Sequence, residues 1–118
     1  MHTAYTLIDP NIIQENLMGN NDLIRQFLQL YETQIPVDFA ALEKAVASGL
    51  HAEISSKAHH IKPTMEYIGA GKIRKELQEL ETAAKNEIEL TQVVAIFEQL
   101  KPQFTVLLTE IKQYLSLL

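Results

Sequence analysis

The chain has 118 residues and no cysteine, and its 15 acidic side chains outnumber its 10 lysines and arginines. The lack of cysteine excludes disulfides, thiolate metal sites and cysteine nucleophiles. The scattered basic residues leave no electrostatic footprint for nucleic acid or an anionic membrane. With 47% hydrophobic and 21% charged residues, we expect one globular domain over residues 1–118 that recognises a protein partner.

The first residues predict a cytoplasmic protein that begins with a short helix. They lack the basic start and apolar run of a signal peptide, and no stretch approaches the ~20 apolar residues of a membrane span. Asp9-Pro10 then marks a helix start, because aspartate can cap free amides and proline fits the first helical position. This helix is expected to run from Pro10 to about Leu17.

A long second helix is predicted after the break at Gly19-Asn20-Asn21. Apolar residues recur at helical spacing from Leu23 to Val46, and either asparagine can cap the helix. Pro36 either kinks this helix or divides it in two, and the resumed periodicity favours a kink.

Three more helices are predicted in the remainder of the chain. The third runs from about Leu50 to Ile68, and its apolar residues are spaced four, three, four and three apart. A fourth follows the Gly69-Ala70-Gly71 break and ends near Asn86. The last, from about Glu89 to Leu117, contains Pro102, where a bend is expected.

The predicted fold is all-α. No segment alternates apolar and polar residues long enough for a strand, and the connections are short. We therefore expect an antiparallel up-down-up-down four-helix bundle with a short extra N-terminal helix. The residues expected to meet in its core are Ile54, Ile61, Ile73, Leu77, Ile96 and Phe104.

His59 is the residue in this pattern with the clearest chemical potential. At about 100° per residue, it lies roughly 120° from the core stripe of the third helix, on the side of Ser55, Lys62 and Glu66. It should therefore be exposed. A neutral imidazole has a nucleophilic lone pair, and Lys62, one turn away, can reach a group attached to the ring. An exposed histidine is more often only solvated, and these properties alone leave that alternative open.

The stretch from Ala58 to Ala70 resembles the signature of histidine-containing phosphotransfer (HPt) domains. That signature has a histidine preceded by alanine, a lysine three positions later and Gly-Ala about ten residues on. The matching residues here are Ala58, His59, Lys62, Gly69 and Ala70. The short first helix, the long second helix, the Leu77-x-x-Leu80-Glu81 segment and the overall length also resemble the family.

The resemblance implies a phosphorelay carrier of two-component signalling, and not an enzyme. His59 would accept a phosphoryl group from a receiver-domain aspartate and pass it to another receiver domain, with Lys62 neutralising phosphate charge. Response-regulator receiver domains or a hybrid histidine kinase would be the partners and would supply magnesium and catalysis, because this chain has no nucleotide motif. The chain itself should need no cofactor or metal and should be a monomer.

The surroundings of His59 are expected to form the docking surface, with Ser55, Pro63 and Glu66 as neighbours. Pro63 departs from the family, which most often has glycine after the lysine. Proline removes the amide that would bond the His59 carbonyl, so the helix should bend there and partner choice could differ. Glu81 should pass near His59 and either orients the ring or is solvated. Lys62, as an exposed cation, should contribute little to stability.

The sequence also offers other histidines and other functions as alternatives. His60 is the rival for phosphorylation, but the register of the motif favours His59, whereas His2 and His51 are expected to be solvated. One alternative function is a helical adaptor in which the histidine has no chemical role. A bundle metalloprotein is disfavoured, because no Glu-x-x-His pair or repeated carboxylate set occurs.

Overall fold

The computed structural model describes residues 5–118, and in that part of the chain it contains five helices and no strand. This confirms the predicted all-α class. Within the same residues, no helix has both the length and the apolar character that crossing a membrane requires. The helices are α1 (Pro10–Asn16), α2 (Asn21–Ser48), α3 (His51–Tyr67), α4 (Gly71–Lys85) and α5 (Leu90–Ser116).

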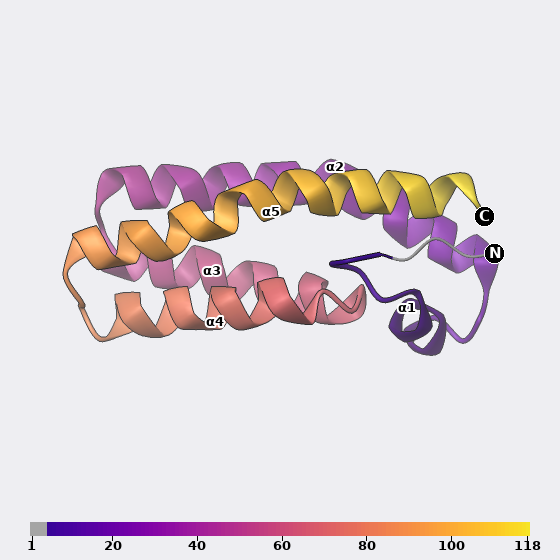
Figure 1. Cartoon of the computed structure of the whole chain (residues 1–118), viewed down its shortest axis with the longest axis horizontal. Helices are drawn as coiled ribbons and strands as arrows, with labels where there is room; N and C mark the ends of the chain where they lie inside the picture. Colours follow the sequence, from indigo (N-terminus) through magenta and orange to yellow (C-terminus); the bar gives the residue numbers. More distant parts are fainter. Residues whose placement is uncertain (1–4) are drawn as a thin grey trace.

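The four long helices lie alongside one another in an elongated molecule of 45 × 22 × 19 Å, with α1 at one end (Figure 1). Helix α2 packs against α3 and α5, and α4 packs against the same two helices. Successive long helices reverse direction at short turns (Figure 1). As a result, α3 and α4 form a hairpin in which the middle of α3 lies beside α4.

The helix ends follow from local sequence. The Asp9 side chain accepts a hydrogen bond from the amide of Asn11, and the Asn20 side chain caps α2 by accepting one from Leu23. Pro36 lies inside α2 and Pro102 inside α5, so neither proline divides its helix. The predicted helix boundaries agree with the observed ones to within one or two residues.

The core is built from the stripes that the spacing predicts. On α3 the whole stripe is buried, and Ile73, Leu77 and Phe104 join it from α4 and α5. Ile96 is only partly buried and packs at the edge, because its neighbour Phe97 takes the inward position on α5. The buried stripe of α3 and its C-terminal cap consists of Ile54, Ala58, Ile61, Met65 and Ile68.

A short N-terminal strap, residues 5–9, is held against α5 by one buried carboxylate. Glu110 accepts hydrogen bonds from the Thr6 hydroxyl at 2.6 Å, from the Thr6 amide at 3.1 Å, and from the Leu7 and Ile8 amides at 3.0 Å. Burial acts to raise the pKa of Glu110, but these hydrogen bonds lower it more, so the pKa lies below its ordinary value. The strap is thus attached through its backbone.

The strap also contacts the turn between α3 and α4. The Asp9 amide donates to the Ile68 carbonyl at 3.0 Å. Gly69 has φ +70°, and a Cβ atom built there would lie 2.6 Å from the Cβ of Asp9. Any side chain at this position would be strained and would collide with the strap. The close approach therefore requires glycine.

We predict that Glu110→Gln lowers the free energy of unfolding by about 2 kcal/mol, because the amide replaces a charged acceptor and leaves buried N–H groups unsatisfied. Urea unfolding measures this loss, and hydrogen exchange should show faster exchange at Leu7 and Ile8. Glu98→Gln, on the exposed side of the same helix, should change stability by less than about 0.5 kcal/mol. Equal stability of the two variants would contradict the role of Glu110.

Candidate functional site

His59 lies in the middle of α3, and its side chain is 67% exposed, as the sequence predicts. The residues before and after it on the core side, Ala58 and Ile61, are fully buried and hold this segment of the helix against the core. Pro63 lies inside α3 and the helix continues through it. The proline has no N–H to donate to the His59 carbonyl, which leaves that carbonyl without its usual helical donor.

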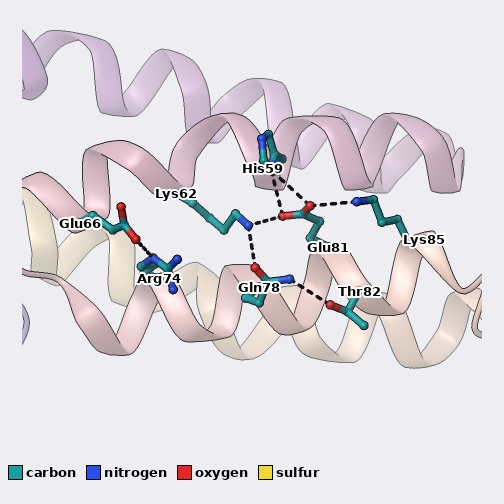
Figure 2. Close-up of polar contacts among 8 residues, drawn as sticks. All are labelled: His59, Lys62, Glu66, Arg74, Gln78, Glu81, Thr82 and Lys85. Carbon is teal, nitrogen blue, oxygen red and sulfur yellow. Dashed lines mark hydrogen bonds and ion pairs between the residues drawn. The ribbon is translucent and has the colours of Figure 1, made fainter.

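One nitrogen of the His59 ring contacts Glu81 of α4 (Figure 2). The Nδ1 atom lies 3.3 Å from Oε1 and 3.2 Å from Oε2 of the Glu81 carboxylate. A carboxylate only accepts hydrogen bonds, so this contact requires a proton on Nδ1 and leaves the lone pair of a neutral ring on Nε2. Among residues 5–118, Nε2 has no hydrogen-bond or ion-pair partner.

Glu81 is buried, so the solvated alternative for this residue is wrong. Burial acts to raise the pKa of its carboxyl group. The hydrogen bond and the charge of Lys62 lower the pKa more, with a smaller contribution from His59, so the pKa of Glu81 lies below its ordinary value. The carboxylate therefore stays ionised beside the ring.

Lys62 is not the exposed cation that the sequence predicts. Its side chain is only 12% exposed, and its Nζ lies 2.7 Å from Oε1 of Glu81 and 2.6 Å from Oε1 of Gln78 (Figure 2). The angle around the helix axis is as expected, but the long side chain extends towards α4, where the buried carboxylate attracts it. Lys62 thus neutralises Glu81 in this structure.

The structure adds two residues of α4 that sequence reasoning missed. Gln78 accepts the Lys62 hydrogen bond and donates to the Thr82 hydroxyl at 3.1 Å, which orients its amide. Lys85 places its Nζ 3.5 Å from Oε2 of Glu81. Gln78 and Lys85 are three residues before and four residues after Glu81, on the same helix face. This spacing in the sequence could have predicted that they contact the surroundings of Glu81.

Of the three expected docking neighbours of His59, only Pro63 and Glu66 are exposed. Ser55 is just 8% exposed, because it lies where α3 packs against its neighbours, and its expected place on the docking surface is wrong. Glu66 forms an ion pair with Arg74 of α4 (Figure 2). The accessible surface next to His59 therefore extends towards Pro63 and the Glu66–Arg74 pair.

The other histidines are arranged differently. His60 is 68% exposed, and its Nε2 lies 3.6 Å from Oδ1 of Asp38 on α2. His51 is not simply solvated, because its Nε2 lies 2.8 Å from the Ile88 carbonyl oxygen. His2 lies outside the described residues. Within residues 5–118, no group of three or more histidine, aspartate or glutamate side chains could hold a metal ion.

Comparison of the chain with protein-family models, with curated proteins and with solved structures finds no match. The resemblance in sequence and the geometry around His59 are therefore the basis on which a function can be proposed.

The two buried glutamates predict an acid-sensitive fold. Their pKa values in the folded protein lie below the ordinary value of 4.5. At a pH between the folded-state values and 4.5, the unfolded chain therefore binds more protons than the folded chain. The stabilisation is fully present above about pH 4.5 and is lost as the pH falls through the folded-state values. Urea unfolding between pH 7 and pH 3 should show this decline. Glu81→Gln should reduce the slope, whereas the exposed Glu79→Gln should leave it unchanged. A slope unaffected by Glu81→Gln would contradict the assignment.

Lys62→Met should lower the free energy of unfolding by about 2 kcal/mol, because it removes the closest counter-ion of a buried carboxylate. The double variant Lys62→Met with Glu81→Leu should recover most of the loss, since the unpaired charge is then gone. Lys75→Met, at an exposed lysine of α4, is the matched control. If Lys62→Met and Lys75→Met are equally stable, the ion pair has no structural role.

Proposed function

We propose that this protein is an HPt phosphocarrier that accepts a phosphoryl group on His59 and passes it between receiver domains of a phosphorelay. The observation that carries the proposal is the buried Glu81 carboxylate on Nδ1 of an exposed histidine. An isolated solvated histidine would need no such partner. The arrangement fixes both the tautomer and the direction of the ring, which is what a nucleophile for in-line transfer needs.

In the proposed step, the Nε2 lone pair of His59 attacks the phosphorus of an aspartyl phosphate on the receiver domain. The bond between phosphorus and the aspartate oxygen breaks, and the carboxylate leaves with the bonding electrons. The Nδ1 proton stays on the ring, which becomes cationic beside Glu81. The reverse step returns the phosphoryl group to another aspartate. Positioning and charge compensation are the main requirements of such a transfer.

The partner would supply what this chain does not hold. In the proposal, a response-regulator receiver domain or a hybrid histidine kinase contributes magnesium and the acidic pocket, and the carrier transfers nothing in the absence of a phosphoryl donor. The order and alternating directions of α2, α3, α4 and α5 in Figure 1 support an antiparallel four-helix bundle of the HPt type. A monomeric, cytoplasmic carrier fits this role.

The proposal predicts that His59→Gln abolishes phosphoryl acceptance and that His60→Gln does not. The two side chains are equally exposed neighbours, so each is a matched control for the other, and neither change should disturb the core. The protein is incubated with a phosphorylated receiver domain and magnesium. Phosphohistidine is then mapped by mass spectrometry under neutral or alkaline conditions, because the bond is acid-labile.

Circular dichroism of both variants checks that the helices remain. Loss of the label in His60→Gln, with His59→Gln still labelled, would contradict the choice of His59. A stable complex with the receiver domain that leaves His59 unlabelled would support the adaptor function instead.

A further inference from the structure

Two lysines flank the Glu81 carboxylate, and their surroundings differ (Figure 2). Lys62 is nearly buried, and two acceptors hold its Nζ at 2.6 and 2.7 Å. Lys85 approaches the other carboxylate oxygen from the opposite side, at 3.5 Å, and its side chain is 68% exposed. One cation is therefore fixed, while the other is held weakly.

Lys85 and the His59 ring share a contact atom. Oε2 of Glu81 lies 3.5 Å from the Lys85 Nζ and 3.2 Å from the His59 Nδ1. The lysine side chain is long and flexible, so a small rotation can carry its ammonium from this oxygen to a group on the exposed edge of the ring. The cost is low, because the Lys85 side chain is exposed, its contact with the carboxylate is long, and Lys62 stays in place as the closer counter-ion of Glu81.

Moving Lys62 would have a larger cost. Its ammonium would have to leave Gln78 or Glu81, and the buried carboxylate would lose its nearest counter-ion. A phosphoryl group on His59 would also add negative charge beside Glu81, which makes the Lys62–Glu81 pair harder to break. The phosphoryl oxygens on His59 therefore attract the cation that Glu81 holds least tightly, which is the ammonium of Lys85.

We propose that Lys85 is the side chain that contacts the phosphoryl oxygens on His59, and that Lys62 is a positioning residue that acts through Glu81. This inference rests on the proposed function and changes the role expected for Lys62. Lys85 also occupies the last turn of α4, where a lysine interacts favourably with the helix dipole. The test must therefore separate contact with phosphate from stabilisation of the helix.

The test uses phosphoramidate, a small donor that needs no partner protein. The donor reacts as its zwitterion, whose nitrogen already carries three hydrogens. The Nε2 lone pair of His59 attacks the phosphorus, the P–N bond breaks and the nitrogen leaves as ammonia with the bonding electrons, while the Nδ1 proton stays on the ring. The initial rate of phosphohistidine formation is followed by ³¹P NMR at low and high salt. The variants are Lys85→Gln, Lys85→Arg and Lys62→Gln, with Lys75→Gln as the exposed control on the same helix.

Lys85→Gln should slow labelling about two- to fivefold at low salt and less at high salt, as expected for one exposed cation. Lys85→Arg should restore the rate, and Lys75→Gln should match the wild type. Thermal unfolding of Lys85→Gln and Lys75→Gln should differ little. A purely structural lysine would give neither rescue by arginine nor the salt dependence of the rate.

The outcomes distinguish this inference from the proposed function. A wild-type protein that gains no label at His59 from phosphoramidate or from a phosphorylated receiver domain contradicts the proposed function itself. A labelled wild type with an unchanged rate in Lys85→Gln overturns only the assignment of Lys85. The assignment of Lys85 is also overturned if Lys62→Gln folds normally, slows labelling more than Lys85→Gln at low salt, and slows it less at high salt. That result would mean that Lys62 contacts the phosphoryl group.

Discussion

A carboxylate buried between two helices stays ionised only while donors or cations surround it. Around Glu81, Lys62 and His59 hold the pKa of the carboxyl group below its ordinary value against the effect of burial, and Lys85 forms a longer ion pair with it. This requirement organises the site. It draws the lysine of α3 across to α4 and turns one nitrogen of the histidine inward, and it leaves the other nitrogen without a partner among residues 5–118. The three partners of Glu81 differ in exposure, from the nearly buried Lys62 to the exposed Lys85, so the carboxylate holds Lys62 firmly and Lys85 loosely.

Glu110 satisfies the same requirement with backbone donors and with a different result. Its partners are mainly amides of the N-terminal strap, which offer no second reactive group, so the interaction only attaches one segment to another. Glu81 is satisfied by side chains that also reach the surface. A buried acid thus serves as an attachment point at one end of the molecule and as the support of an exposed imidazole in the middle.

The sequence predicted the helices, most of the core and the exposure of His59, because each follows from spacing along a single helix. The predictions from sequence were wrong where the exposure or the contacts of a side chain depend on a neighbouring helix. Ser55 and Lys62 lie on the predicted side of α3, but neighbouring helices cover part of that side, so Ser55 is buried and Lys62 forms an ion pair with Glu81 of α4. The role of Glu110 could not be inferred, because its donors are backbone groups of a segment without periodicity.

The contact between Asp9 and Gly69 has a consequence for the alignment of the hairpin. The strap can lie against the turn between α3 and α4 only because Gly69, with φ +70°, has no side chain that projects towards Asp9. Since His59 and Glu81 lie on opposite arms of this hairpin, a slip at the turn would move the imidazole and the carboxylate past each other. The strap, residues 5–9, is remote from the histidine, yet it supports the turn on which the alignment of these two side chains depends.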